Sequence, residues 1–325
     1  MSTPLMGFFQ LVAPVCLSLM ALYLYRGDDY FQFGINVLVL FGFVNAVGGI
    51  VQFYISPNLF GLISSRVYDG TLEYDVTKRA VSILSSPQSL SIYLAFCLTI
   101  VRYLSVDFLL KIFVFVVIFI CGVLSGSKAF FVFLLAYMLL STSLKNVTFV
   151  ILVLLSLILF SFYYRTGIDT FDRVLDLPVK LMELGNYGTF KIWKDFILFP
   201  SSMLELFFGR GIGVMSTASQ TINNYQTLGG STESFLIQLY FELGLVGLFL
   251  FILMFSYAPL KYIFLKSNSR SFAISIISLF SNMAFSPAFF GFTTSCLFFF
   301  AFSICLRANI FNEKDMCVND SVSKR

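Results

Sequence analysis

Long stretches without a charged residue constrain this chain more than any other feature. Residues 80–101 and 271–306 contain no Asp, Glu, Lys or Arg. At about 1.5 Å per residue, a single helix over 271–306 would reach about 54 Å, well beyond the roughly 30 Å hydrocarbon core of a bilayer. We therefore expect two membrane crossings there, with the turn near Ser286, Pro287 and Gly291.

The composition agrees with a chain that lies mostly in lipid. Of its 325 residues, 12% are charged and 58% are hydrophobic. A soluble domain usually carries about 25% charged residues. The difference excludes a secreted enzyme, a nucleic-acid-binding domain and a disordered regulator. We expect an all-α polytopic membrane protein with about 9–10 transmembrane helices, in which residues 1–325 form a single integral membrane domain.

The other uncharged runs give the remaining predicted spans. Two of them, 112–127 and 129–144, would cover only about 24 Å each as helices. Flanking Lys111, Lys128 and Lys145 can extend them by snorkelling to the bilayer surface. Only two connections are long, and they cover residues 56–85 and 165–233. The further spans are 5–25, 30–65 with a helix stop at Pro57-Asn58, 146–164 and 234–258.

Basic residues in the short loops predict the orientation. When the loops between predicted spans are assigned in turn to the two sides of the membrane, eleven basic residues of the short loops and the C-terminal tail fall on one side. The positive-inside rule places that side in the cytoplasm. The C-terminus is then cytoplasmic, and both long loops are outer loops. The same count puts Met1 outside, which leaves open a further N-terminal span or a miscount by one. The eleven residues are Arg26, Arg102, Lys111, Lys145, Lys261, Lys266, Arg270, Arg307, Lys314, Lys324 and Arg325.

Histidine is absent from the chain, which excludes histidine catalysis and zinc binding by imidazole. The six cysteines form no C-x-x-C pair and five of them lie in apolar runs, which favours lipid-buried thiols over a metal site or disulfides. The outer loops also contain no D-x-D pair. We therefore expect neither a metal nor a cofactor.

The large outer loop, 165–233, is balanced in charge and rich in aromatic residues. Its six basic and seven acidic side chains argue against a polybasic lipid-binding patch. Its length exceeds that of a simple connector, and its aromatic content argues against disorder. Phe190, Trp193 and Phe196 recur at helical spacing, which predicts an interfacial helix that packs on the membrane or stacks on sugar rings.

The most specific stretch covers residues 207–251, which begin FFGRGIG and end FELGLVGLFLF. It resembles the C-terminal signature of the O-antigen polymerase and ligase superfamily, in particular the Wzy-type polymerases. That signature has alternate glycines, then a polar loop with a histidine or an acid, then a helix reading E-x-G-x-x-G. Gly209, Gly211 and Gly213 match the first part, Glu233 the second, and residues 242–247 the third.

Upstream matches extend the resemblance over roughly residues 35–300. Arg79, shortly before a Ser-Pro pair, is similar to the family's entry into a span. The turn 125–128 is similar to another motif of the family, with Lys128 in place of arginine. Trp193 matches the tryptophan of an R-x-x-x-W pattern, although Thr189 stands at the arginine position and Lys191 lies nearby.

The resemblance implies a GT-C-like fold and a glycosyl transfer at the outer face of the bacterial inner membrane. The donor would be an undecaprenyl-pyrophosphate-linked glycan and the acceptor a repeat unit on the same lipid, giving O-antigen or a similar polysaccharide. A chain-length regulator and a flippase are the implied protein partners. The leaving pyrophosphate needs positive charge, and the acceptor hydroxyl needs a general base.

Within that chemistry, Glu233 is the candidate catalytic base. Candidate residues for binding pyrophosphate or sugar are Arg79, Lys128, Arg173, Lys191, Trp193, Gly209, Arg210, Gly211 and Gly213.

Each candidate has a structural alternative. Arg79 and Lys128 can simply anchor spans, and Arg210 can pair with Glu205. The glycines of 209–213 can form a phosphate nest or only let the loop re-enter the membrane surface. Glu233 can stabilise a helix N-terminus through the helix dipole.

Other functions also stay open. An O-antigen ligase would share the fold and the donor but deliver glycan to lipid A-core, and the absence of histidine counts against it. A flippase or other transporter is expected to show internal repeats and charges deep in several spans. Here Glu242 is the clear case, and we expect it to make an ion pair or hydrogen bond inside the bundle. A structural membrane subunit is the last alternative.

Overall fold

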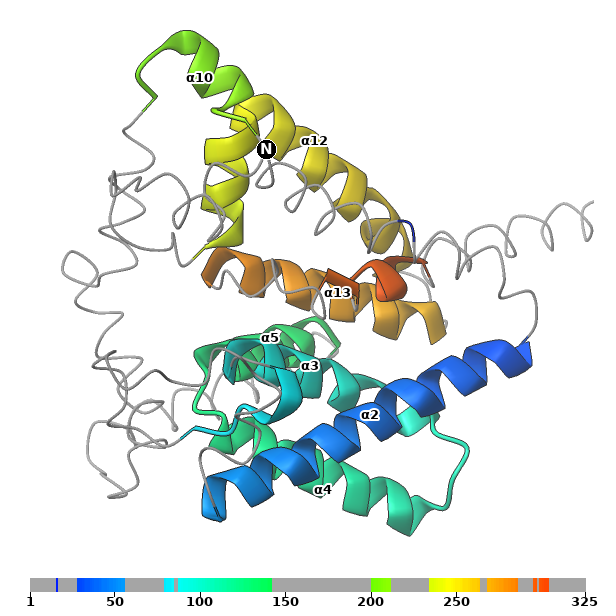
Figure 1. The fold of residues 1–325 in the computed structure, drawn as a ribbon. Coiled ribbons are helices and arrows are strands. Elements are labelled where there is room, and N and C mark those ends of the chain that lie inside the picture. Colours follow the sequence, from blue (N-terminus) through cyan, green and yellow to red (C-terminus); the bar gives the residue numbers. More distant parts are fainter. Residues whose placement is uncertain are drawn as a thin grey trace, which may run out of the picture.

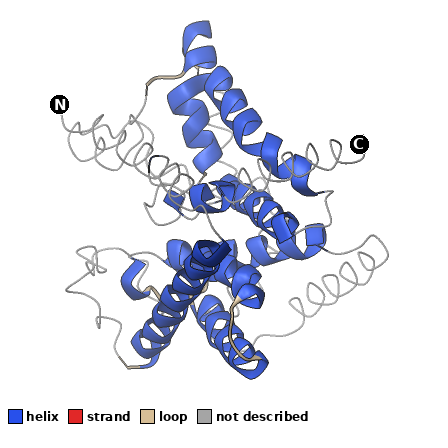
Figure 2. Cartoon of the chain, turned by 90° about the vertical axis from the view of Figure 1, so that its right-hand side faces the viewer, coloured by secondary structure: helices blue, strands red, loops and turns tan. Residues whose placement is uncertain are grey.

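The computed structural model describes residues 16, 28–55, 79–84, 87–141, 200–211, 234–263, 268–285, 295–296 and 298–303. Every regular element in these ranges is helical, and they contain no strand (Figure 2). The expected all-α architecture is therefore confirmed for this part of the chain. Apart from Cys16, the predicted spans over 5–25 and 146–164 lie outside the described residues.

The helices form a layered bundle (Figure 1). In it, α2 packs against α3 and α4, α3 also packs against α5, and α13 lies between α5 and α12. The short helix α10 packs on α12. The bounds are α2 Asp28–Tyr54, α3 Pro87–Ile100, α4 Phe108–Leu124, α5 Lys128–Ser141, α10 Met203–Phe208, α12 Phe235–Ile263 and α13 Asn268–Phe285, with 3-10 turns η1 Ser82–Leu84 and η2 Val101–Tyr103.

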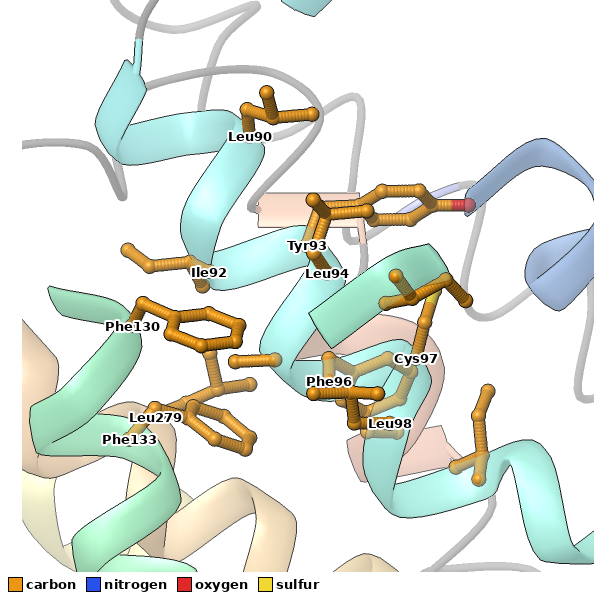
Figure 3. Packing of buried hydrophobic residues seen from close by; sticks show 14 of the residues in the cluster. Leu90, Ile92, Tyr93, Leu94, Phe96, Cys97, Leu98, Phe130, Phe133 and Leu279 are labelled. Carbon is orange, nitrogen blue, oxygen red and sulfur yellow. The ribbon is translucent and has the colours of Figure 1, made fainter. Parts of the chain in front are cut away.

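Helix α3 is the centre of the bundle. All of its residues from Ser89 to Ile100 are buried, which is typical of a helix surrounded by other helices. Phe130 and Phe133 of α5 and Leu279 of α13 converge on it (Figure 3). The hydroxyl of Tyr93 donates a hydrogen bond of 2.7 Å to the Leu38 carbonyl and so ties α3 to α2.

Two described helices could cross a membrane by length and composition, over Gln32–Tyr54 and Phe235–Lys261. The outer surface of α4 is strongly apolar, with Phe108 74% and Leu109 79% exposed. A contiguous apolar surface of this kind is unusual for a soluble monomer and is suited to contact with lipid chains. The same holds for the second half of α12, where Phe249 and Tyr257 are exposed.

Several predicted boundaries match the helices. The last residue of α13 is Phe285, which agrees with a helix that stops before Pro287, and the expected turn itself lies outside the described residues. Helix α4 stops where Gly126 takes a φ of +58°, a left-handed conformation that ends a helix, and α5 begins at Lys128 two residues later. The short 112–144 region therefore contains two helices, as its flanking lysines predicted.

The predicted single span over 80–101 is wrong in its first third. Helix α3 begins only at Pro87, because proline lacks an N–H and is accommodated best in the first turn of a helix. Before α3, residues 79–81 have no regular structure and residues 82–84 form the 3-10 turn η1. Helix α4 begins at Phe108, earlier than expected, so that Lys111 lies in its first turn and donates to the Arg102 carbonyl.

The helix ends gather at two opposite sides of the bundle. At one side, Gln32 donates to the Tyr103 carbonyl at 2.7 Å, and the Tyr103 ring stacks on Phe272. At the other side, Ser234 at the start of α12 donates to the carbonyl of Met283 near the end of α13. Arg102 and Arg270 lie near the first side. The predicted orientation in the membrane stays a prediction, and most of the two long loops lies outside the described residues.

Helix α12 is two helices joined at a bend. Gly244 has φ +67° and ψ −171°, far from helical values, and it divides a first arm, 235–243, from a second arm, 245–263. The rings of Phe235 and Phe251 lie 5.6 Å apart, whereas 16 residues of straight helix would separate them by about 24 Å. The two arms of α12 therefore form a V beside α13 (Figure 1). The first arm leads away from the end of α13, and the second arm turns back toward the start of α13.

Aromatic side chains hold the second arm in place. Phe255 contacts Phe298, Phe299 and Phe302 at centroid distances of 5.0, 5.4 and 4.9 Å. Phe251 also contacts Phe280 of α13 at 6.1 Å. Part of the high phenylalanine content thus serves helix–helix packing, where edge-to-face pairs add to the burial of area.

Candidate functional site

The two glycine motifs of the 207–251 stretch meet at the bend of α12. Helix α10 ends at Phe208, and residues 209–211 then pass alongside Phe241 and Glu242 (Figure 1). The Arg210 N–H donates to the Phe241 carbonyl at 2.9 Å, and the Gly211 N–H donates to the Glu242 carbonyl at 3.0 Å. Because the bend interrupts the helical hydrogen bonds, carbonyls near the end of the first arm are available to this second segment.

Gly209 and Gly244 make this contact sterically possible. Both have positive φ, +71° and +67°, in a region that is essentially restricted to glycine. A Cβ atom on Gly209 would collide with the Glu242 carbonyl, and one on Gly244 would collide with the Phe207 carbonyl. The two backbones therefore interlock at a distance that only glycine permits.

The start of α10 is capped by its own side chains. The Ser202 hydroxyl accepts from the Glu205 N–H, and Glu205 in turn accepts from both the N–H and the hydroxyl of Ser201 at 3.0 and 2.6 Å. This arrangement is a variant of the capping box. The two hydrogen bonds from Ser201, with a smaller contribution from Arg210, lower the pKa of Glu205 below its ordinary value.

Arg210 lies on the outer surface of this corner. Its Nη2 atom is 3.3 Å from Glu205 Oε2, and its Cζ atom is 4.7 Å from the centre of the Phe241 ring. The salt bridge with Glu205, the structural alternative for Arg210, is therefore present. The pair is solvated, with 30% of the Arg210 side chain exposed, so the guanidinium can still reach a ligand.

The phosphate nest, one of the two alternatives for these glycines, is not formed by residues 209–211. The N–H of Gly209 donates to the Glu205 carbonyl at 2.8 Å, and those of Arg210 and Gly211 donate to the bend of α12. All three groups are occupied, so the glycines serve the contact between α10 and α12. Arg210 is then the group of this segment that can bind an anion, through its side chain.

Glu242 makes the hydrogen bond that its position predicted. Its side chain is 3% exposed and accepts from Gln238 Nε2 at 3.1 Å. The bend corrects its expected depth: Glu242 lies at the corner of α12 and not two turns down a straight span. Ser234, Gln238 and Glu242 follow one another at intervals of four and are all buried, so the first arm presents a polar face to the protein interior.

Arg79 and Lys128 are brought to the same end of the bundle. The N–H of Ala80 donates to the Leu124 carbonyl at 3.1 Å, which places Arg79 beside the turn that precedes Lys128. Ala80 and Ser127 are buried, while Arg79 and Lys128 are each partly exposed.

The other predicted site residues, Arg173, Lys191, Trp193, Gly213 and the candidate base Glu233, lie outside the described residues. Ser234, which follows Glu233, is buried at the junction of α12 and α13. The described residues contain no group of three or more Cys, Asp or Glu side chains that would hold a metal ion.

Sequence reasoning missed Asn45, Gln52 and Ser82, three buried polar residues behind Arg79. Ser82 has φ +55°, its hydroxyl contacts Asn45 Oδ1 at 3.1 Å, and its N–H donates to Gln52. A signal was present, because Asn45 and Gln52 are two amides seven residues apart on one face of an apolar helix.

Comparisons of the chain with protein-family models, with curated proteins and with solved structures find no match in any of the three.

Proposed function

We propose that this protein is a metal-independent, lipid-linked glycosyltransferase of the bacterial inner membrane that polymerises repeat units into O-antigen or a similar surface polysaccharide. The interlocked corner of Gly209 and Gly244 carries the proposal. It joins the two halves of the 207–251 signature and leaves the Arg210 side chain exposed at the end of the bundle where the outer loops are expected.

The proposed chemistry takes place on the undecaprenyl pyrophosphate of the donor. As the C1–O bond breaks, negative charge develops on the leaving pyrophosphate, and fixed cations stabilise it. Arg210 offers a planar, permanent charge with paired N–H donors that match phosphate oxygens. Arg79 and Lys128 form a second cationic group at the same end of the bundle, suited to the other lipid-linked substrate.

The acceptor hydroxyl has to lose a proton as it attacks C1, and Glu233 is the proposed base. Since Ser234 is held against Met283, the chain next to Glu233 is fixed at the outer end of α13. The apolar surfaces of α4 and of the second arm of α12 support a location within the membrane. The resemblance implies the bacterial inner membrane, and the basic loops predict a cytoplasmic C-terminus.

Deletion of the gene in its host, followed by gel analysis of lipopolysaccharide, tests this proposal. Loss of a polymerase leaves lipid A-core with a single repeat unit. Loss of a ligase leaves bare core with polymer retained on undecaprenyl pyrophosphate. Loss of a flippase also leaves bare core, with single repeat units trapped on the cytoplasmic side. An unchanged ladder of bands would refute all three roles in O-antigen synthesis, and unchanged surface polysaccharide as well would refute the proposal.

A further inference from the structure

The segment that carries Arg79 is fixed in the bundle although it has little regular structure. Ala80, Val81, Ser82 and Leu84 are all less than 9% exposed. A buried irregular segment must satisfy its backbone N–H groups locally, because neither water nor a helix does so. Three consecutive residues, 80–82, find their acceptors in α2 and α4.

A single oxygen atom of Gln52, on α2, accepts two of these three hydrogen bonds. This atom, Oε1, accepts from the Val81 N–H at 3.0 Å and from the Ser82 N–H at 2.8 Å. The third N–H, that of Ala80, donates to the Leu124 carbonyl at the end of α4. The Gln52 side chain is 6% exposed, so these hydrogen bonds are shielded from competing water.

Asn45 fixes the other side of the same segment. The Ser82 hydroxyl donates to Asn45 Oδ1 at 3.1 Å, and Asn45 Nδ2 donates to the Phe41 carbonyl at 2.8 Å. Asn45 is fully buried, and Ser82 holds a positive φ that a residue with a Cβ adopts rarely. The surroundings impose this conformation, and it is a local departure from the easiest path of the chain.

Close backbone contact completes the arrangement. Gly49 lies between the two amides, and a Cβ atom there would be 2.7 Å from Cys121 Sγ and 3.4 Å from Ala80 Cβ. Helix α2 can therefore approach both the 79–84 segment and α4. The position of Arg79 relative to the turn at 125–128 is thus set by contacts within the protein core.

We propose that Gln52, with Asn45 in support, is a positioning residue that fastens segment 79–84 so that Arg79 and Lys128 act together on the phosphate groups of a lipid-linked substrate. The inference rests on the proposed function. It adds that an amide inside the membrane helix, which touches no substrate, sets substrate affinity. Loosening the segment leaves both charges in the chain but lets Arg79 move away from Lys128.

The first part of the test measures the fastening without any activity. Trypsin is added to spheroplasts, and cleavage of the Arg79–Ala80 bond is followed by mass spectrometry. The wild-type bond resists cleavage because Ala80 is buried and its N–H is bound. Gln52→Leu removes the oxygen that accepts both hydrogen bonds and exposes the bond, whereas Gln52→Glu keeps an acceptor oxygen at this position and protects it. If the Arg79–Ala80 bond of Gln52→Leu still resisted trypsin, the inference that Gln52 holds this segment in place would be refuted.

The second part measures turnover of the undecaprenyl-pyrophosphate-linked repeat unit, extracted from a strain that lacks this gene. Gln52→Leu is expected to raise KM about tenfold with a smaller change in kcat, because it loosens substrate binding and leaves the base in place. Gln52→Glu restores KM. Exposure of the bond without a change in KM would overturn the positioning role.

Thr99→Val is the matched control. Thr99 is also buried and hydrogen-bonded, with 3.0 Å between its Oγ1 and Ser275 Oγ, but it is remote from the 79–84 segment. It should alter neither cleavage nor KM, and an effect as large as that of Gln52→Leu would reduce the result to general destabilisation. Gln52→Asn, which shortens the reach of the amide, replaces the leucine variant if that protein is not recovered from membranes.

Failure of the proposed function gives a different pattern. In that case the wild-type protein does not elongate the repeat unit, while the Arg79–Ala80 bond still responds to Gln52→Leu. The positioning role for this substrate would then be refuted together with the activity, and the fastening of the segment would stand by itself.

Discussion

Gly209 and Gly244 are separated by 35 positions in the sequence and adopt nearly the same backbone conformation, with φ/ψ of +71°/−170° and +67°/−171°. Each lies against the main chain of the other's segment. The contact converts a short surface helix and a bent apolar helix into one rigid corner. The position of Arg210 in the bundle is set by this contact.

Replacing Gly244 by alanine should detach α10 from α12. The alanine would have to hold a positive φ, which costs on the order of 1–3 kcal/mol, and its Cβ would meet the Phe207 carbonyl. We expect a lower midpoint of thermal unfolding for the protein purified in detergent, and the same for Gly209→Ala. Gly211→Ala is the control, because its φ is +104° but nothing lies within 4 Å of the added Cβ. If all three variants are equally destabilised, strain alone explains the effect and the interlock does not matter.

Substitution of Arg210 separates anion binding from surface pairing. Arg210→Lys keeps the charge but loses the planar pair of donors, so polymer synthesis should fall. In Arg210→Ala, polymer synthesis should fall further, by about 10²-fold, while the amount of protein in the membrane stays unchanged. Glu205→Gln is the companion variant, since it weakens the salt bridge and leaves Arg210 in place. Full polymer length in Arg210→Ala would make this residue a structural partner of Glu205 only.

Thiol labelling of intact cells tests the orientation of the bundle. After removal of the six native cysteines, Met203→Cys on α10 should react with a membrane-impermeant reagent, because this side chain is 74% exposed at the outer end. Ser105→Cys, also exposed but beside Arg102 at the opposite end, should react only after the cells are opened. The reverse labelling pattern would invert the topology and place the Arg210 corner in the cytoplasm.

Glu233 is tested by exchanges that separate a base from a helix-terminal charge. A charge at a helix N-terminus contributes about 0.3–1 kcal/mol, so on that basis Glu233→Gln would change polymer yield little. Loss of a general base should lower the rate by about 10²–10⁴ and leave core with one repeat unit. Glu233→Asp should keep part of the activity, and Glu233→His should keep part if the ligases of the resembled family use their histidine in the same role. A normal ladder in Glu233→Gln would remove this residue from the mechanism.

The sequence predicted several helix ends to within a few residues, because charges and prolines are costly inside an apolar helix and often mark its limits. The end of α13 at Phe285 and the start of α5 at Lys128 follow from this. The late start of α3 was missed, although Pro87 lay inside the predicted span. An uncharged run shows that a segment can enter lipid, but it does not show that the segment is helical throughout.

The bend at Gly244 was not predicted, because glycine within an apolar run is also common in straight membrane helices. The glycines of 209–211 were recognised as special, but the sequence left open whether they bind a phosphate or let the chain pass close to another segment. Glycine spacing indicates a close approach of the backbone, and whether the approaching group is a phosphate or another peptide depends on tertiary contacts. The fastening of Arg79 by Gln52 was likewise beyond sequence reasoning, since the partners are the backbone N–H groups of Val81 and Ser82.

The bend of α12 also changes how the chain fits a bilayer. A straight helix of 29 residues would be about 44 Å long, and the excess over a roughly 30 Å core would have to be absorbed by strong tilting or local thickening of the membrane. The second arm alone, 245–263, is about 28 Å long and matches that core. If the second arm alone spans the core, the first arm is left at the end of the bundle, and Glu242, next to the bend, would lie near the lipid headgroups. An acidic side chain can thus occur in the middle of an uninterrupted hydropathy peak without entering the hydrocarbon.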